Sequence, residues 1–339
     1  MDRVQADVQS IIEKKGLFEP FSKATFLITG ATGLVGSMTI RTLVMADEKY
    51  DLGIKVIGQI RNPEKAKTVL ADVMNRIELT TTYDVGADYI IHTVSPTTSK
   101  FFIEHPVETI KASVESTMSV LEVARKNGAS VVYLSSMEQY GVPYESGQRM
   151  TEDKVGIIDH LNVRSSYSES KRLCECLCAS YASEYDVDVK IARLAQTVGA
   201  GVPLTDNRMP MQFARVVVEG KDIVLHTEGK SISNFVYLTD AIKGILTVLD
   251  KGKKGQAYNV CNDQETRSVR EIAELVCHEV AEDTIKVRIE KKENMGYAPD
   301  NTMRLNADRL RSLGWNAEVG TTEAYRRLVE YLRERLFAD

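Results

Sequence analysis

The chain has 339 residues with a formal net charge of −5, and it is 43% hydrophobic and 27% charged. This composition is typical of a folded globular protein, and the length favours one large domain plus a smaller one. The weak negative charge offers no basic surface for nucleic acid. No apolar run approaches the roughly 20 residues that span a bilayer. We therefore expect no nucleic-acid or membrane partner.

The five cysteines show no disulfide spacing, which suits a reducing cytosol and predicts a cytoplasmic protein. Cys174, Cys176 and Cys178 form a C-x-C-x-C run that could suggest a metal site. The run falls in a predicted helix, where residues two apart do not face each other. We expect ordinary thiols and no metal. Residues 1–23 lack the apolar segment of a signal peptide and are expected to form a helical extension.

The first half of the chain alternates strands with helices, as in a doubly wound parallel sheet. Apolar runs predict strands at 24–29, 54–60, 89–94, 130–134 and 187–194, with a weaker one within 75–83. Helices are predicted at 34–46, from Pro63 onward, at 107–126 and at 167–185. The pattern predicts an α/β protein with a Rossmann doubly wound parallel sheet.

After Leu194 the rhythm changes, because residues 199–208 are rich in Gly, Pro, Asp and Asn and predict a loop. Short strands and helices then alternate without a strict period. This half predicts a smaller C-terminal α/β lobe that binds the substrate. We assign 24–195 plus about 235–260 to a dinucleotide-binding domain. The substrate-binding domain takes 196–234 plus 261–339.

A glycine-rich segment, Thr29–Gly36, follows the first predicted strand and opens a helix. Glycines there let the backbone turn tightly and approach a pyrophosphate, and the helix N-terminus offers free N–H groups. This context favours a dinucleotide site over the alternative, a tight turn with packing glycines. The expected cofactor-binding residues in this loop are Gly30, Thr32, Gly33, Leu34, Val35 and Gly36. Elsewhere in the chain they are Arg61, Asn62, Thr93 near the end of a later strand, Tyr167 and Lys171.

The end of the second strand bears on the choice between NAD and NADP. An acidic residue there usually accepts hydrogen bonds from the NAD ribose, whereas an arginine accommodates the 2′-phosphate of NADP. This chain has Arg61 and Asn62 with Lys65 nearby, and no carboxylate. We expect an NAD(P) cofactor with NADP slightly favoured. Alternatively, Arg61 is a solvated loop residue.

A second motif, Tyr167-Ser168-Glu169-Ser170-Lys171, places a phenol and an ammonium four residues apart on a predicted helix, and thus on one face. A tyrosine base at neutral pH needs its pKa lowered by about three units, or roughly 4 kcal/mol. The charges of Lys171 and an oxidised nicotinamide are suitable sources. Ser136 can hydrogen-bond the same substrate oxygen. Alone, the motif is equally compatible with an exposed helix face.

Together these motifs make the chain resemble an extended short-chain dehydrogenase/reductase of the nucleotide-sugar epimerase/dehydratase/decarboxylase group. The resemblance covers residues 25 to about 336. Further marks are Ser135–Gly141, Phe235–Asp240, Tyr258–Val260 and Arg304–Trp315. It implies that Ser136, Tyr167 and Lys171 are catalytic. It also implies a homodimer in which the helices at about 107–126 and 165–185 pair across a two-fold axis.

Glu138 stands where the dehydratases and decarboxylases of the family carry an acid/base residue, so the resemblance implies that it is catalytic. It favours chemistry beyond a bare oxidation and re-reduction at one carbon. Met137, where glucose-type 4,6-dehydratases carry aspartate, counts against that assignment. The structural alternative for Glu138 is a hydrogen-bond acceptor at a strand end.

The substrate side departs from the family pattern. Ser233 replaces an arginine that helps hold the nucleotide diphosphate, and Gln196 replaces an asparagine. Lys230 or Arg208 could supply the missing charge, although a lysine cannot imitate a bidentate guanidinium. The expected substrate-binding residues are Ser95, Gln196, Arg208, Lys230 and Ser233. The change at Ser233 counts against a decarboxylase acting on a UDP-uronic acid.

The preferred hypothesis is an NAD(P)-dependent enzyme that epimerises, dehydrates or decarboxylates a nucleotide sugar through a transient keto-sugar. An alternative is an NADPH-dependent reductase of a keto-sugar nucleotide. A protein of another class, a non-catalytic dinucleotide sensor, would have no need of Ser136, Tyr167 and Lys171 together. The sequence does not indicate which sugar or nucleotide is bound.

Overall fold

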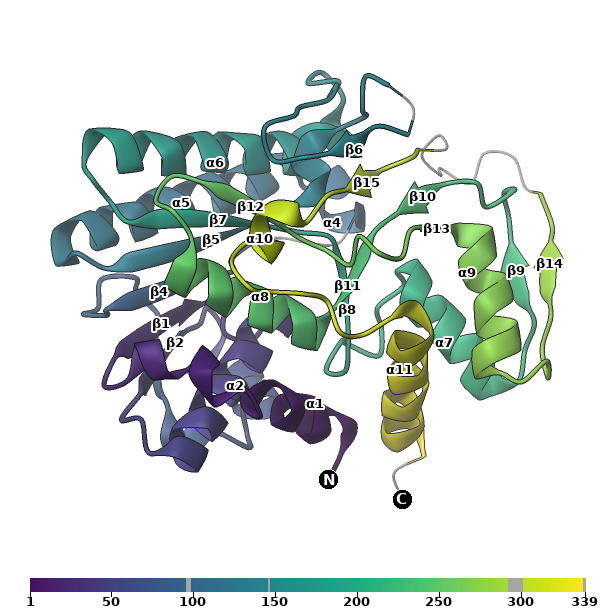
Figure 1. Cartoon of the computed structure of the whole chain (residues 1–339), viewed down its shortest axis with the longest axis horizontal. Coiled ribbons are helices and arrows are strands. Elements are labelled where there is room, and N and C mark those ends of the chain that lie inside the picture. Colours follow the sequence, from purple (N-terminus) through teal and green to yellow (C-terminus); the bar gives the residue numbers. More distant parts are fainter. Residues whose placement is uncertain (96–98, 146, 292–300, 338–339) are drawn as a thin grey trace.

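The computed structural model, which describes residues 1–95, 99–145, 147–291 and 301–337, is built on a seven-stranded parallel sheet (Figure 1). The strand order is β12-β7-β5-β4-β1-β2-β3. The strands are β1 (Thr25–Thr29), β2 (Lys55–Gln59), β3 (Glu78–Thr80), β4 (Tyr89–His92), β5 (Ser130–Ser136), β7 (Val189–Leu194) and β12 (Ala257–Val260). The order reverses between β1 and β4, where ligands bind in open α/β sheets. The predicted Rossmann fold is confirmed.

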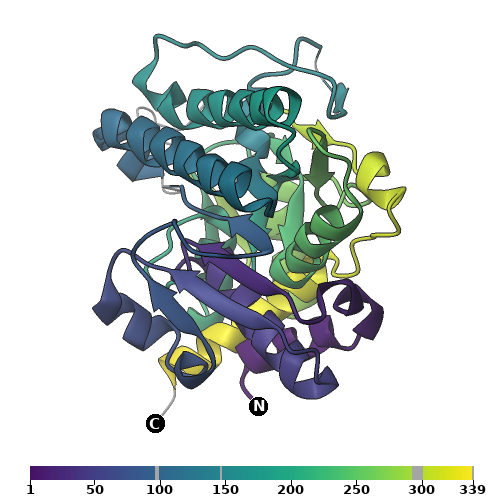
Figure 2. The same ribbon diagram turned by 90° about the vertical axis from the view of Figure 1, so that its left-hand side faces the viewer.

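Helices cover both faces of this sheet because successive strand residues point to opposite sides. Leu27, Ile90 and Val131 pack toward α5 (Pro106–Asn127) and α6 (Ser166–Glu184). Their neighbours Phe26, Ile91 and Val132 belong to the larger core on the other side. That side carries α1 (Arg3–Ile12), α2 (Leu34–Tyr50) and α8 (Leu238–Lys251). Figure 2 shows α5 and α6 side by side over one face of the sheet.

The C-terminal lobe consists of short paired strands and helices. Among the described residues, four short strand pairs lie outside the seven-stranded sheet. They are β8 (Gln196–Val198) with β11 (Phe235–Tyr237), β9 (Ile223–Leu225) with β14 (Val287–Ile289), β10 (Ile232–Ser233) with β13 (Arg267–Ser268), and β6 (Arg149–Met150) with β15 (Arg304–Leu305). The helices of the lobe are α7 (Met209–Glu219), α9 (Val269–Leu275), a π-helix (Val276–Val280), α10 (Asp308–Arg311) and α11 (Thr321–Leu336). Residues 199–208 form the predicted loop. The domain boundaries remain a prediction.

The N-terminal extension forms α1, whose first turn is closed by a capping box between Asp2 and Gln5. Val8, Ile11 and Ile12 are buried against the sheet domain. The two ends of the chain meet, since α1 contacts α11 and Asp2 pairs with Arg335 (Figure 1). The extension therefore packs onto the fold rather than standing apart from it.

The predicted elements agree with the structure in most places. The weak segment at 75–83 contains only the three-residue β3, while α3 (Pro63–Val69) begins at the expected proline. A short helix, α4 (Ser99–Glu104), was not expected. In the described ranges no helix is long and apolar enough to cross a membrane. Those ranges also hold no group of three or more His, Cys, Asp or Glu side chains arranged for a metal.

Candidate active site

The glycine loop joins β1 to α2 and leaves almost no room for side chains. Gly30 has a left-handed φ of +63°, and a Cβ there would lie 2.6 Å from the Thr93 Oγ1. A Cβ on Gly36 would lie 2.5 Å from the Gly30 carbonyl oxygen. Gly33 is the N-cap of α2, whose first N–H groups lack helical partners. The loop thus has the close backbone turn and helix N-terminus that a dinucleotide pyrophosphate requires.

The end of β2 contributes one residue that the sequence did not single out. Gln59 is buried; its main-chain oxygen accepts from the Ala31 N–H at 3.1 Å, and its Oε1 accepts from the Gly30 N–H at 3.4 Å. Arg61 is exposed; burial raises the pKa of Tyr83, and the charge of Arg61 partly offsets that rise. The Asn62 side chain caps α3 by accepting from the Lys65 N–H at 3.0 Å. Arg61 and Asn62 thus lie beside the glycine loop, and their cofactor roles stay predictions.

The end of β4 is fastened to the same loop. The Thr93 hydroxyl donates to the Thr29 carbonyl oxygen at 2.6 Å. His92 is buried between the hydroxyls of Thr29 and Thr117, at 2.7 and 3.2 Å. Burial, helped by the charge of Lys171, lowers the pKa of His92 to about 3, so the imidazole is neutral. Ser95 follows, with its hydroxyl 3.3 Å from that of Ser113.

Ser136 and Tyr167, predicted to act together, lie near each other. Ser136 ends β5 and Tyr167 lies in the first turn of α6, where the Ser136 hydroxyl is close enough to lower the pKa of the Tyr167 phenol. Tyr167 is buried and stacks on Phe102 with ring centroids 5.3 Å apart. Burial raises the pKa of Tyr167 to about 12, while the Ser136 hydroxyl and the charge of Arg208 lower it and Glu138 raises it. Bringing the pKa of Tyr167 down toward neutral pH would need an additional positive charge, such as that of an oxidised nicotinamide.

Lys171 lies one turn further along α6 and is also buried. Its Nζ donates to the Leu134 carbonyl oxygen at 2.7 Å and lies 5.7 Å from the ring centroid of Tyr167. Desolvation lowers the pKa of Lys171 to about 8. The predicted pair therefore shares one helix face, and the alternative of an exposed face is wrong for these residues.

Glu138 lies two residues beyond Ser136, in a short 3₁₀ turn (Met137–Tyr140) whose N-cap is the Ser136 side chain. Its side chain is accessible to water, yet protein surrounds it on most sides, and this desolvation raises its pKa. The charge of Arg164 lowers it. The charge of Glu138 raises the pKa of Tyr167, so a group able to act as an acid or base lies near the phenol.

A buried ionic cluster, also not foreseen from the sequence, holds these elements together. Glu175 on α6 forms a bidentate pair with Arg193 on β7, with the closest contact 2.6 Å, and accepts from the Ser135 hydroxyl at 2.5 Å. Arg193 also donates to the Tyr140 hydroxyl at 2.8 Å. Because Ser135 precedes Ser136 and Glu175 lies one turn after Lys171, the cluster fixes β5 and α6 relative to each other.

The five predicted substrate residues fall in different surroundings. Gln196 and Arg208 line one pocket together with Asp206. Lys230 is exposed, and its charge lowers the pKa of Glu228. Ser233 lies directly opposite Arg267 in the antiparallel β10–β13 pair. Directly opposed residues share a face, so the Arg267 side chain leaves this strand pair on the same side as Ser233, beside the position where the resemblance expects an arginine. Its buried Nε has no hydrogen-bond partner among the described residues.

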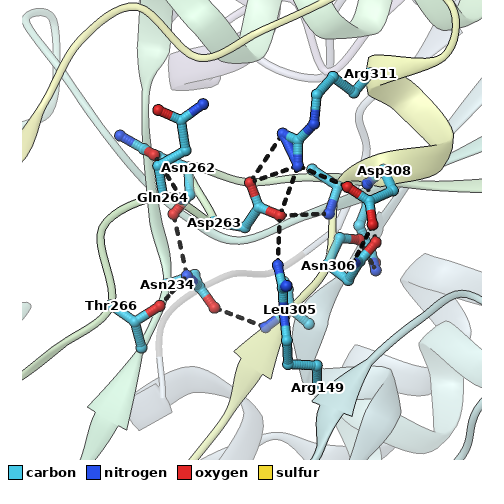
Figure 3. Close-up of polar contacts among 12 residues, drawn as sticks. Arg149, Asn234, Asn262, Asp263, Gln264, Thr266, Leu305, Asn306, Asp308 and Arg311 are labelled. Carbon is cyan, nitrogen blue, oxygen red and sulfur yellow. Dashed lines mark hydrogen bonds and ion pairs between the residues drawn. The ribbon is translucent and has the colours of Figure 1, made fainter.

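The residues around Ser233 are fixed by a polar cluster (Figure 3). The buried Asn234 side chain donates to the Asn262 carbonyl oxygen at 3.0 Å and accepts from the Leu305 N–H at 2.7 Å. The buried Asp263 carboxylate pairs with Arg149 and Arg311, each at 2.9 Å. These contacts join β6, β15 and α10 to the residues just before β11 and just after β12, and so connect the C-terminal lobe to the sheet.

Comparison with known families decides the assignment, because the model of the NAD dependent epimerase/dehydratase family matches residues 26–261, more than half of the chain. The chain belongs to this family. This confirms the resemblance and the expectation of an NAD(P)-dependent enzyme of the epimerase/dehydratase type. The matched residues include the glycine loop, Ser136, Tyr167 and Lys171.

This epimerase/dehydratase family member is 29% identical to UDP-glucuronic acid decarboxylase 6 of Arabidopsis thaliana over 321 residues, 93% of the chain and 90% of that protein. It is 25% identical to UDP-glucuronic acid decarboxylase 1 of Danio rerio, over 91% of the chain and 73% of that protein.

Two solved structures share its fold. An epimerase from Methanothermobacter thermautotrophicus has a TM-score of 0.78 at 18% identity, covering 95% of this chain and 96% of its own. A dTDP-glucose 4,6-dehydratase from Streptomyces venezuelae, with NAD bound, has a TM-score of 0.72 at 20% identity, covering 92% and 98%.

Proposed function

We propose that the chain is a nucleotide-sugar-modifying enzyme that works through a transient keto-sugar. The observation that carries this proposal is the placement of Ser136, at the carboxyl end of β5, near the buried Tyr167, which lies one helical turn from the buried Lys171 on α6. Relatives named UDP-glucuronic acid decarboxylases and dTDP-glucose dehydratases support a nucleotide-sugar substrate. The glycine loop suits a dinucleotide, because it turns tightly at Gly30 and leaves the first N–H groups of α2 without a side-chain cap.

When bound, the nicotinamide dinucleotide supplies reversible acceptance of a hydride from a sugar carbon. Tyr167 takes the proton of the hydroxyl on that carbon, and Ser136 holds the same oxygen through its hydrogen bond. Lys171 stabilises the phenolate because its ammonium is desolvated and lies over the tyrosine ring. Glu138, with its raised pKa, exchanges a proton with the keto-sugar or its leaving group.

The substrate's diphosphate is held from the C-terminal lobe. Arg208 contributes a guanidinium whose charge reaches Tyr167, and Arg267 contributes one opposite Ser233. The proposal also keeps three predicted substrate-binding residues, which are Ser95, Gln196 and Lys230. Because Arg267 supplies a guanidinium, Ser233 alone does not argue against decarboxylation of a UDP-uronic acid, the reaction named in the curated relatives.

The deciding experiment incubates the enzyme and its co-purified dinucleotide with UDP-, dTDP-, GDP- and CDP-sugars, UDP-glucuronic acid included, and analyses products by mass. We expect a modified sugar without net cofactor consumption. Stoichiometric consumption of NADPH with a keto-sugar would replace this proposal by the reductase alternative. Absence of dinucleotide binding would contradict the proposal altogether.

The proposal includes a preference for NADP, carried by Arg61 at the end of β2. Arg61 is exposed just after β2, the position at which an arginine would accommodate the 2′-phosphate of NADP, and the described turn holds no carboxylate there. Titration of apoenzyme with both dinucleotides should show tighter binding of NADP, and Arg61→Ala should remove that difference while leaving NAD affinity unchanged. Equal or tighter binding of NAD to the wild type would contradict the preference.

The proposal also includes a cytoplasmic homodimer built on α5 and α6. The five cysteines are free, as a reducing compartment would keep them. Ile110 and Met118 on α5 and Leu173 on α6 are exposed apolar residues on the two helices that the resemblance places at the dimer interface. Sedimentation at micromolar concentration should give a dimer, and Met118→Lys should shift it toward monomer.

A further inference from the structure

Asp206 and Arg208 form a close pair in the loop that precedes α7. The Arg208 Nε donates to the Asp206 Oδ2 at 2.9 Å, and Nη2 lies 2.9 Å from the same oxygen. The Arg208 main-chain N–H donates to the Asp206 Oδ1 at 2.8 Å. One edge of the guanidinium is therefore held by a carboxylate only two residues away.

The other edge of this guanidinium is available to a ligand. Among the described residues, no group accepts a hydrogen bond from Nη1. The Arg208 side chain is 46% exposed, whereas that of Asp206 is 11% exposed, so the carboxylate lies beneath the guanidinium. Both residues line the pocket that contains Gln196, and the charge of Arg208 acts on the catalytic Tyr167.

The loop that carries the pair is itself held in place. Arg215 of α7 donates to the carbonyl oxygens of Leu204 and Asp206, at 2.7 and 3.1 Å. The Tyr331 hydroxyl of α11 donates to the Val202 carbonyl oxygen at 2.9 Å. The carboxylate of Asp206 is thus a fixed point against which a long arginine side chain can be ordered.

We propose that Asp206 is a positioning residue that orients Arg208, so that its free edge binds the diphosphate of a nucleoside diphosphate group. The inference rests on the proposed function for the identity of that ligand. A guanidinium recognises phosphate oxygens through paired N–H groups, and the geometry of that pairing depends on the orientation of the plane. Ordering Arg208 in advance removes part of the entropy cost of binding.

Electrostatic repulsion alone predicts that Asp206 weakens binding of the diphosphate, which is the opposite of a positioning role. A carboxylate close to a diphosphate repels it, so if Asp206 did no more than neutralise Arg208, Asp206→Asn would tighten nucleotide binding. If Asp206 orients Arg208, the same variant weakens binding despite the favourable change in charge. The sign of the change in affinity therefore distinguishes positioning from neutralisation.

The test measures binding of UDP, dTDP, GDP and CDP to the wild-type enzyme by calorimetry and continues with the tightest. Asp206→Asn should weaken that nucleotide about 3- to 10-fold, as expected when one long side chain must be ordered on binding. Arg208→Gln should weaken it about 10- to 100-fold by removing charge-assisted hydrogen bonds. The matching nucleoside, which has no phosphate, should bind equally to all three proteins.

A structural role in the loop is tested by combining the two substitutions. If Asp206 acts through Arg208, Asp206→Asn has no further effect on nucleotide affinity in the Arg208→Gln background. An equal loss in both backgrounds, or tighter binding by Asp206→Asn, would overturn the inference while leaving the proposed function intact. If the wild type binds none of the four nucleotides, the inference and the proposed function both fail.

Discussion

The Tyr237 hydroxyl donates a 2.5 Å hydrogen bond to the Asp7 Oδ2, joining the end of β11 to the N-terminal helix across 230 residues of sequence. Asp7 is fully buried, and its other oxygen accepts from Arg3 at 2.9 Å and from Arg327 of α11 at 3.2 Å. One carboxylate thus connects α1, α11 and β11, the strand that pairs with β8. The extension is part of the folded core, as the buried Val8, Ile11 and Ile12 also show.

Replacing Asp7 should therefore destabilise the whole protein. Asp7→Ala leaves two arginines and a phenol without their acceptor, which typically costs about 3–5 kcal/mol when an ion pair is buried. Tyr237→Phe removes only one hydrogen bond and should cost about 1–2 kcal/mol. Urea unfolding measures both. Glu330→Gln, which alters an exposed partner of Arg3, is the control and should change little. Equal stability of Asp7→Ala and wild type would contradict this account.

The glycine loop provides a second prediction, at Gly36. Alanine is the better helix former by about 1 kcal/mol, so propensity alone predicts that Gly36→Ala stabilises α2. The collision of its Cβ with the Gly30 carbonyl oxygen predicts the reverse, a loss of about 1–3 kcal/mol. Dinucleotide affinity should fall as well, because the loop must move.

Gly86→Ala is the matched control for that variant, since a Cβ at Gly86 meets nothing within 4 Å. It should leave both stability and dinucleotide affinity unchanged. A Gly36→Ala protein that is more stable than wild type and binds the dinucleotide normally would show that the loop has room that the structure does not indicate.

The sheet and the positions of the candidate catalytic residues on it could be predicted because their signals are local. Apolar runs gave the strands, the glycine spacing indicated the turn, and four-residue spacing put Tyr167 and Lys171 on one helix face. The weak segment at 75–83 proved to be a three-residue edge strand, whose residues Glu78 and Leu79 are exposed and so lack an apolar pattern.

The partners of the catalytic residues could not be predicted because they are distant in sequence. Ser135 and Glu175 meet across 40 residues. Arg267 lies opposite Ser233 only because β10 and β13 are antiparallel in this register. Arg208 was expected on the substrate side, but its orientation by Asp206 is a property of one loop conformation.

The proposed role of Tyr167 as the proton acceptor can be tested by comparing it with Tyr133, the other tyrosine ring near Lys171. Lys171 Nζ lies 5.7 Å from the Tyr167 ring centroid and 4.9 Å from that of Tyr133, which is buried beside Cys174. Tyr167→Phe should lower turnover about 10²- to 10⁴-fold and spare dinucleotide binding, because only the proton acceptor is lost. Tyr133→Phe, which makes the same change in the other ring near Lys171, should retain most activity. Comparable losses in both variants would argue against a specific role for Tyr167.

The last prediction concerns Lys171, because burying its charged ammonium lowers the free energy of unfolding. Its pKa is about 8 in the folded protein, against an ordinary value of 10.5. Below about pH 8 the lysine is charged in both states, and the full desolvation cost of roughly 3 kcal/mol applies. As pH rises from about 8 to 10.5, the folded protein holds the neutral amine while the unfolded chain still binds the proton, so this cost fades.

Lys171→Met should consequently be inactive yet more stable than wild type near neutral pH, by about 2 kcal/mol after allowing for the lost bond to the Leu134 carbonyl oxygen. The advantage should shrink toward about pH 10, as urea unfolding of both apoproteins would measure. Lys190→Met is the control, because that buried ammonium is paired with Asp188 at 2.6 Å and Ser130 at 2.9 Å and its loss should only destabilise. If Lys171→Met is destabilised as much as Lys190→Met at neutral pH, the ammonium of Lys171 is better compensated than its surroundings indicate.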